Sequence, residues 1–401
     1  MRKINKSGKI GLFLLNPFVS AITSLKDIRD GYSHKLLYAW FIIFGAGFCA
    51  VNESADSFRY VEDFKIESNY SWDRYVNEIE YWFSFEGETK DVYTLTVNYF
   101  VGRFTDNYHW TFFIYAVVFG LFYIKSLKIF LKNTQRNDWL FYTLLFMFCY
   151  SNPIFNINGV RFWTAAWIGV YVGLKLFVEK QYRYLPLLIL MPIIHGSSVI
   201  WVAILGIAWL TRYFQSVWIA LFIASSFVSA MTYLPMMDRY TVFLPQFMQN
   251  QIWSYTESDM AQERLEGHSQ YGKAYADFLI ALPGYFKLLL SCILIFNRKK
   301  INTSEAKKTL FTVFLALSAM TNFLSAIPSV GRFMSMVLPF FVIVWMQNAD
   351  ALKKYNYLFY AVPVLYAYSL LYWFRHMSSV TEMYLYVFPA PITVIKYLFL
   401  V

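Results

Sequence analysis

The chain consists of apolar runs separated by short polar or charged stretches, and this pattern constrains its fold more than any other feature. Of its 401 residues, 58% are hydrophobic and only 15% are charged, whereas soluble domains carry about a quarter charged residues. A water-exposed fold has no interior large enough for this much apolar surface, so lipid is expected to surround most of the chain. In lipid the backbone polar groups must be satisfied within the chain, which favours helices.

The apolar runs predict an all-α polytopic membrane protein with about 12 transmembrane helices, forming a single membrane domain over residues 1–401. The candidate spans are 36–51, 109–130, 139–151, 160–178, 184–194, 197–211, 214–234, 276–296, 309–327, 332–348, 356–374 and 382–401. Several are shorter than the roughly 20 residues of a straight crossing, so half-helices are expected among them. The segments 10–25 and 92–104 are more typical of interfacial helices.

The distribution of positive charge predicts how the chain is oriented. With the N-terminus in the cytoplasm, 23 of the 35 lysine and arginine residues fall on the cytoplasmic side, as the positive-inside rule requires. This set includes the basic residues of 125–136 and 298–308, and also Lys396 near the C-terminus. The net charge of +10 is therefore mostly a topology signal, and no nucleic-acid partner is expected.

Two segments are assigned to the outer side. Residues 52–104 form an outer, periplasmic acidic loop with an amphipathic helix, and the part from 52 to 91 holds eleven carboxylates against four basic residues. Residues 235–275 form the second outer loop. We therefore look for chemistry on this side of the membrane.

The stretch between Arg183 and Arg212 contains a turn inside the hydrophobic region. Both arginines are expected on the cytoplasmic side, so the intervening chain must cross and return as two short helices, with His195 at the outer turn. Pro186 and Pro192 suit a bent, shortened helix. His195 is then either a satisfied core residue or a group that donates a hydrogen bond to a leaving group or orients an acceptor hydroxyl.

Five cationic or titratable side chains lie close to apolar spans on the outer side. They are Arg59, Arg161, His195, Lys287 and Arg332. Each alone could be an interfacial anchor that reaches the headgroups, but charged groups at membrane depth usually face a cavity or a partner. The planar fork of arginine binds phosphate in a bidentate manner, so several arginines around one cavity indicate a diphosphate ligand. In a membrane, a polyprenyl diphosphate carrier fits this description.

The acidic outer loop supplies candidate bases for a glycosyl transfer. The carboxylates just beyond the first span are Glu53, Asp56, Glu62 and Asp63, and most of the loop's carboxylates must simply be solvated. Aromatic side chains such as Tyr60 offer flat faces for sugar rings, or form an interfacial belt. The sequence contains no HxxH, HExxH, DxD, CxxC or P-loop motif, so no metal and no other cofactor is expected.

Five short motifs follow one another in order. They are ADSFRYVEDF at 55–64, VNYFVGRFTDNYHWTFFIYA at 97–116, NGVRFWTA at 158–165, IIHGSSVI at 193–200 and GRF at 331–333. Together they resemble the EpsG/Wzy family of polysaccharide polymerases over residues 36–350. Three features depart from the family pattern: its glycine before Asp56 is missing, Arg59 is an extra charge, and Phe162 replaces the usual glutamine after the arginine.

The resemblance implies a GT-C-like glycosyltransferase in the bacterial inner membrane, with its active site facing the periplasm. Such enzymes transfer a growing glycan from undecaprenyl diphosphate to the non-reducing end of another lipid-linked oligosaccharide repeat, without a metal or a nucleotide sugar. The implied partners are these lipid-linked donor and acceptor oligosaccharides, membrane lipid and a chain-length regulator.

The resemblance also implies roles for single residues. Arg161 and Arg332 would hold the donor diphosphate, and His195 would assist at the leaving group or the acceptor. Asp56 would be the base or the group that positions the acceptor. The candidate substrate-binding residues are Arg59, Tyr60, Asn158 and Lys287. Tyr60 and Asn158 match positions of the motifs, whereas Arg59 and Lys287 are candidates because they lie close to apolar spans on the outer side.

Two other classes share much of this pattern. A flippase for lipid-linked oligosaccharides would favour charges along the depth of the bundle and symmetry between its halves, and no internal repeat is found. An O-antigen ligase would share the arginines, the histidine and the topology, but usually gathers its acceptor residues in a large late periplasmic loop. Since the early and late outer loops have comparable lengths here, the ligase alternative stays open.

Overall fold

The described part of the chain is helical, and several of its helices are long and apolar. The computed structural model describes residues 5–50, 53, 55–84, 92–227, 274–325, 330–377 and 380–400. Four stretches could cross a membrane by length and composition: His109–Lys132, Trp139–Phe177, Phe278–Phe296 and Lys353–Arg375. The described part of the chain is therefore all-helical, and its long apolar helices indicate a multi-pass membrane protein, which confirms the predicted fold class at this level.

The N-terminal segment forms three helices whose starts are capped by side chains. They are α1 (Lys6–Leu15), α2 (Pro17–Lys26) and α3 (Gly31–Ala46). The side chains of Asn5, Asn16 and Asp30 each accept a hydrogen bond from a backbone N–H in the first turn that follows. Asn16 both ends α1 and caps α2, so the predicted interfacial segment 10–25 is two short helices and not one.

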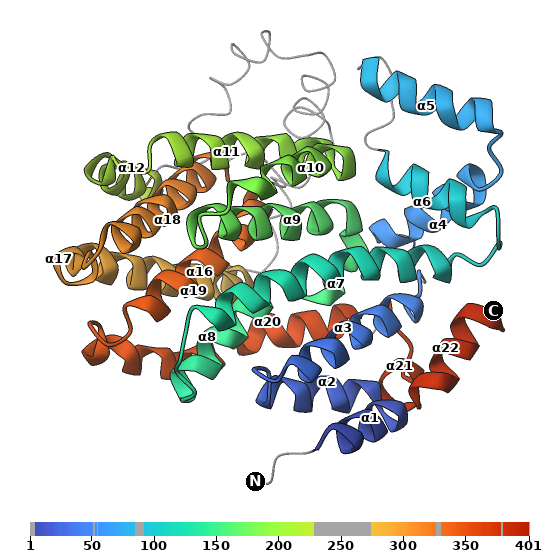
Figure 1. Cartoon of the computed structure of the whole chain (residues 1–401), viewed down its shortest axis with the longest axis horizontal. Helices are drawn as coiled ribbons and strands as arrows, with labels where there is room; N and C mark the ends of the chain where they lie inside the picture. Colours follow the sequence, from blue (N-terminus) through green and yellow to red (C-terminus); the bar gives the residue numbers. More distant parts are fainter. Residues whose placement is uncertain are drawn as a thin grey trace.

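The predicted acidic outer loop folds into three helices at one end of the bundle. They are α4 (Asp56–Glu67), α5 (Trp72–Ser84) and α6 (Tyr93–Val101). Figure 1 shows them at the right, with the short helix α17 (Arg298–Ile301) at the opposite end. We call these the α4 end and the α17 end. The predicted second outer loop, 235–275, lies almost wholly outside the described residues.

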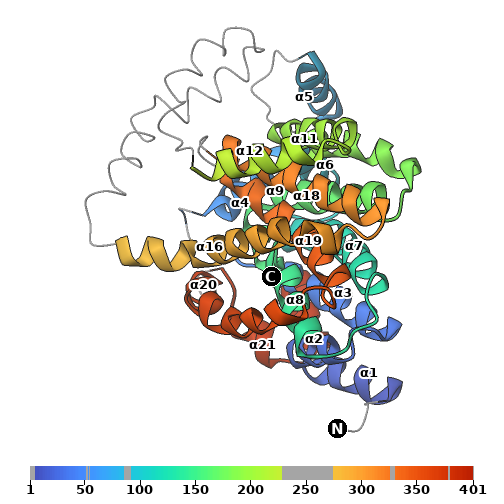
Figure 2. The same cartoon turned by 90° about the vertical axis from the view of Figure 1, so that its left-hand side faces the viewer.

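The centre of the bundle consists of apolar helices that are buried on most faces. They are α7 (His109–Lys132), α8 (Trp139–Tyr150), α9 (Val160–Phe177), α18 (Glu305–Leu324) and α19 (Phe333–Gln347). Trp167 of α9 and Trp345 of α19 have no exposed surface. Figure 2 shows α9, α18 and α19 between α11 (Val199–Leu210) and α12 (Gln215–Phe227) on one side and α1 and α2 on the other. Helix α9 therefore has a fixed position, from which its first turn presents Arg161.

The chain around His195 follows the prediction of two short helices. It forms η2 (Tyr182–Ile189), α10 (Leu190–Ile194), η3 (Gly196–Ser198), α11 (Val199–Leu210) and α12 (Gln215–Phe227). His195 has an extended backbone between α10 and η3. Pro186 lies inside η2, the bent first part of the crossing. The predicted turn at His195 is confirmed.

The C-terminal part of the chain corrects one assignment. Its elements are α16 (Ala274–Phe296), η5 (Val330–Arg332), η6 (Lys353–Ala361), α20 (Val362–Met377), α21 (Tyr384–Val387) and α22 (Ala390–Phe399). The backbone carbonyl of Tyr397 accepts from Asn107 at 2.8 Å, and that of Leu398 accepts from Trp110 at 3.0 Å. Lys396 forms an ion pair with Glu382. The segment 382–401 is thus no single span, and Lys396 lies at the start of α7, away from the α17 end where it was expected.

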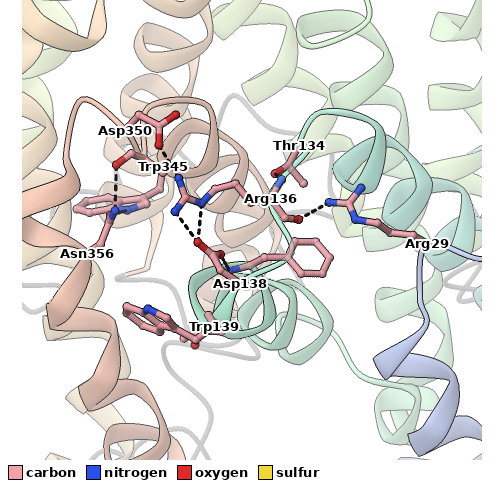
Figure 3. A network of polar contacts seen from close by, with 11 residues as sticks. Arg29, Thr134, Arg136, Asp138, Trp139, Trp345, Asp350 and Asn356 are labelled. Carbon is pink, nitrogen blue, oxygen red and sulfur yellow. Dashed lines mark hydrogen bonds and ion pairs between the residues drawn. The ribbon is translucent and has the colours of Figure 1, made fainter. Parts of the chain in front are cut away.

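A polar network joins three connections near the α17 end (Figure 3). Arg136, between α7 and α8, forms ion pairs with Asp138 and with Asp350 beyond α19. The guanidinium of Arg29 donates to the backbone carbonyl of Arg136 at 2.6 Å. Asp138 also caps α8 by accepting from the backbone N–H of Phe141 at 3.0 Å. This network fixes the ends of the central helices relative to one another, away from the α4 end.

Helices α3 and α7 pack closely at Gly45, which gives a stability prediction. A Cβ atom at Gly45 would lie 2.3 Å from the Ala116 Cβ and 2.5 Å from the Phe112 carbonyl oxygen. We expect Gly45→Ala to destabilise the protein by about 1–3 kcal/mol, because the two helices must move apart. Thermal unfolding in detergent measures this effect.

Gly206 of α11 is the matched control for Gly45→Ala, since nothing lies within 4 Å of a Cβ atom there. Gly206→Ala should be neutral or stabilising, because alanine is the better helix former by roughly 1 kcal/mol. Equal losses of stability in the two variants would contradict the close packing of α3 on α7.

Candidate functional site

An asparagine-rich turn between α8 and α9 positions the first turn of α9. The Asn152 side chain donates to the Trp163 carbonyl at 3.0 Å, and the backbone carbonyl of Asn152 accepts from Trp167 Nε1 at 3.0 Å. Asn156, in the 3₁₀ helix η1 (Ile154–Gly159), donates to the Asn152 side chain at 2.9 Å. These bonds satisfy polar groups of a sharp reversal in an apolar bundle. They fix the direction in which Arg161 leaves α9.

Arg161 contacts a tyrosine of the motif helix α4. Its Nε donates to the Tyr60 hydroxyl at 3.3 Å, and its guanidinium carbon lies 5.3 Å from the centroid of the Tyr60 ring. The hydroxyl and the ring face both favour a cation. The structure thus brings together two predicted site residues that are 101 positions apart in the sequence.

Asp56 and Asn158 meet where α4 begins. Ala55 at the start of α4 provides no side-chain cap, and the Asn158 side chain takes that role from η1. Its Oδ1 accepts from the Ser57 backbone N–H at 3.2 Å. A Cβ atom at Gly159 would lie 3.2 Å from Trp163 Cδ1 and 3.7 Å from Asp56 Oδ2, so the Asp56 carboxylate lies beside η1. Asn158, predicted to bind substrate, therefore holds α4 against η1.

His195 and Arg332 lie on another side of the same α9 turn. The ring of Phe162 is 5.6 Å from the His195 ring and 5.2 Å from the Phe333 ring, centroid to centroid. The Arg332 guanidinium carbon lies 5.9 Å from the Phe162 centroid. Phe333 in turn stacks on Trp201 at 6.1 Å. Phe162, the departure from the family pattern, is thus the apolar centre that places His195 and Arg332 beside α9.

The second motif, 97–116, includes α6 and the start of α7, and its side chains contact the C-terminal part of α4. Buried Asn98 of α6 donates to Glu67 Oε2 at 2.7 Å, and its Oδ1 accepts from the Tyr115 hydroxyl of α7 at 3.2 Å. A Cβ atom at Gly102 would lie 2.3 Å from the Ser68 Cβ, so only glycine permits this contact with the end of α4. The motif therefore connects α4 to the membrane helix α7.

Asp63 is a partly buried carboxylate of α4. It follows Tyr60 by three positions and Arg59 by four, so all three belong to one face of α4. Burial raises the pKa of Asp63 above its usual value, and the positive charges of Arg161 and Arg59 oppose this shift. A carboxyl group of this kind holds its proton to a higher pH than a solvated aspartate.

Lys287 stays apart from these residues. It is buried near the middle of α16, with 8% of its surface exposed. Helix α16 packs mainly on α20, and both views show these two helices side by side (Figures 1 and 2). Within the described residues, no hydrogen bond, ion pair or ring contact links Lys287 to the other predicted site residues. The structure thus gives Lys287 no place in the cluster around α9.

Two adjoining groups of polar residues from several elements therefore lie around the first turn of α9. One group consists of Asp56, Arg59, Tyr60, Asp63, Asn158 and Arg161, and the other of His195 and Arg332. Among the described residues, no set of three His, Cys, Asp or Glu side chains is placed to hold a metal ion. The class defined by fold and site is a multi-pass helical membrane protein with arginines gathered at one end of its bundle.

The comparisons with known proteins identify the family within this class. A model of the EpsG family matches residues 32–388, and the chain belongs to this family, which is linked to exopolysaccharide synthesis. The match includes every predicted site residue. No curated protein and no solved structure matches the chain.

Two residues, Asp63 and Asn98, have surroundings that the sequence alone does not indicate. In the sequence, Asp63 is one of four candidate bases, and Asn98 is only part of a motif. The helical spacing of Asp63 from Arg59 and Tyr60 was a usable signal once α4 was assumed to be a helix. Nothing in the sequence indicated the contacts of Asn98 with α4 and α7, because they link three separate segments.

The cap that Asn158 supplies to α4 can be tested directly. Asn158→Ala should destabilise the start of α4 by about 1 kcal/mol, because the Ser57 N–H loses its acceptor. Hydrogen exchange at the Ser57 amide should become faster. Asn69→Ala is the control, since this exposed side chain bonds only at the other end of α4. Unchanged Ser57 exchange in Asn158→Ala would contradict the capping role.

Proposed function

We propose that the chain is a polysaccharide polymerase. It transfers a growing glycan from undecaprenyl diphosphate to the non-reducing end of another lipid-linked oligosaccharide repeat. The observation that carries this proposal is the placement of Arg161 and Arg332 on two sides of one helix turn, with His195 beside them. Membership of a family linked to exopolysaccharide synthesis supports it.

The orientation follows from the separation of charge between the two ends of the bundle. Lysines and arginines cluster on α17 and at the start of α18, whereas carboxylates cluster on α4 and α5. By the positive-inside rule, the α17 end is cytoplasmic and the α4 end is periplasmic. The proposal places the protein in the bacterial inner membrane, with about 12 crossings and a GT-C-like arrangement. A chain-length regulator is a further proposed partner.

In this reaction the arginines act on the leaving group. Arg161 and Arg332 bind the diphosphate of the donor, and their fixed charges stabilise the negative charge that develops as the sugar–phosphate bond breaks. His195, next to Phe162, donates a hydrogen bond to the diphosphate or orients the acceptor hydroxyl. Tyr60 holds the Arg161 side chain in position, so little reorganisation is needed when the donor binds.

Elongation in vitro tests this function. Purified protein is supplied only with lipid-linked repeats, and the products are separated by length. Arg161→Ala, Arg332→Ala and His195→Ala should each reduce elongation by about a hundredfold or more, because each removes a group that stabilises the transition state. Arg74→Ala is the matched control: this exposed arginine lies on α5, near Tyr70 and away from α9.

The same assay separates the competing classes. A flippase would yield no longer product, and a ligase would yield product only when a core-lipid acceptor is added. Elongation by wild-type protein that persists unchanged in all three variants would refute the assignment of the site.

A further inference from the structure

The α17 end contains a cavity that lies outside the site described above. Its volume is about 420 Å³, which falls in the range of small-molecule sites, roughly 300–1,000 Å³. It is bounded by the connection from α7 to α8 (residues 133–136), the first turn of α18, and the end of α19 with Asp350 beyond it. The orientation proposed above places this cavity on the cytoplasmic side. A ligand bound here would therefore contact three separate segments, away from the α9 turn.

The side chains that line the cavity are mainly polar. They include the cations Arg136 and Lys307, the carboxylate of Asp350 and the amides of Asn133, Gln135 and Gln347. The apolar lining is limited to one alanine and one methionine, and none of the described residues that line the cavity is aromatic. Planar rings and apolar ligands bind mostly against apolar and aromatic side chains. The cavity instead suits a small, charged ligand that forms many hydrogen bonds.

The two cations keep donors that the protein itself does not use. Arg136 lies between Asp138 and Asp350 (Figure 3), and three of its five N–H groups donate to these carboxylates. The other two N–H groups remain for a ligand. The ammonium of Lys307 is partly buried, and within the described residues it forms no hydrogen bond or ion pair. Phosphate oxygens accept strong, charge-assisted hydrogen bonds from both kinds of group.

Asp350 gives the cavity an acceptor that a bare phosphate would not use. Its side chain is 95% exposed and pairs with Arg136. A carboxylate repels inorganic phosphate, but it accepts hydrogen bonds from hydroxyl groups. The amide of Gln347 makes one long contact, 3.5 Å from its Nε2 to Asn133 Oδ1, so it is also available to hydroxyls. The lining therefore fits a ligand with a phosphate at one end and hydroxyl groups at the other.

We propose that this cavity binds a polyol phosphate, which is a phosphate ester that carries neighbouring hydroxyl groups. Lys307 and Arg136 bind the phosphate, and Asp350 and Gln347 bind the hydroxyls. Two sources offer this chemistry on the cytoplasmic side: the glycerophosphate headgroup of a membrane lipid, and a soluble sugar or glycerol phosphate. The site shares no residue with the cluster around α9, so the inference goes beyond the proposed function and does not rest on the polymerase reaction.

Binding to the purified full-length protein is measured with one probe for each source. Phosphatidylglycerol is titrated against the detergent-solubilised protein and counted by native mass spectrometry, with phosphatidylethanolamine, whose headgroup has no hydroxyl, as the lipid control. Glycerol 3-phosphate is titrated by isothermal calorimetry, with inorganic phosphate as its control. We expect one polyol phosphate to bind at least about tenfold more tightly than its control, because the control lacks the hydrogen bonds of the hydroxyls. Which of the two binds identifies the source.

Three variants test the assigned contacts. Lys307→Ala should weaken the binding of that polyol phosphate about tenfold or more, because it removes a charge-assisted hydrogen bond. Lys308→Ala is the matched control and should bind like wild type, since Lys308 pairs with Glu305 at 3.4 Å and does not line the cavity. Asp350→Ala should weaken polyol phosphate binding but strengthen the binding of inorganic phosphate, because it removes both an acceptor for hydroxyls and a repelling charge.

Equal losses in Lys307→Ala and Lys308→Ala would overturn the proposal, since binding would then reflect only the general positive charge of the α17 end. The proposal also fails if neither polyol phosphate binds more tightly than its control. A change of the same direction for both ligands in Asp350→Ala would refute the recognition of hydroxyl groups. None of these outcomes depends on elongation, so they leave the polymerase function untouched.

Discussion

The contact between Arg161 and Tyr60 joins the two parts on which the site depends. Helix α9 lies in the apolar centre of the bundle, whereas α4 is a polar helix at its end. A guanidinium at the boundary of an apolar region is unfavourable unless polar or aromatic groups surround it. Tyr60 provides both a hydroxyl and a ring face, and Asp63 adds a negative charge nearby. The interactions of the Arg161 guanidinium with these groups therefore stabilise the packing of α4 against the bundle.

Two further contacts hold α4 in its position against the bundle. Asn158 caps its start from η1, and Asn98 binds Glu67 near its end while accepting from α7. Each asparagine satisfies a polar group of α4 that would otherwise require water. A polar helix fixed at both ends keeps its middle turn, with Tyr60 and Asp63, at a constant position relative to α9. Preorganisation of this kind is what electrostatic catalysis requires.

The sequence predicted those features that depend on composition and local pattern. Apolar runs predicted the helical membrane class, and the short stretch between two basic loops predicted the turn at His195. The position of Arg161 beside an apolar span made it a candidate, and the order of motifs identified the family. Contacts between distant segments could not be predicted from charge counting. Lys396 was placed with the cytoplasmic lysines, yet the last helix folds back to the start of α7 and pairs it with Glu382. In the sequence Lys287, like the arginines, lies close to an apolar span on the outer side. Its helix α16, however, packs mainly on α20.

Asp56 and Asp63 belong to one motif but lie in different surroundings. Asp56 lies in the first turn of α4, at the junction with η1, where a Cβ atom at Gly159 would be 3.7 Å from its Oδ2. Asp63 lies about one turn beyond Tyr60, which contacts Arg161, and burial raises the pKa of Asp63 while the positive charges of Arg161 and Arg59 oppose the shift. A motif fixes which residue types are present, whereas the packing of α4 on η1 and α6 decides what surrounds each carboxylate.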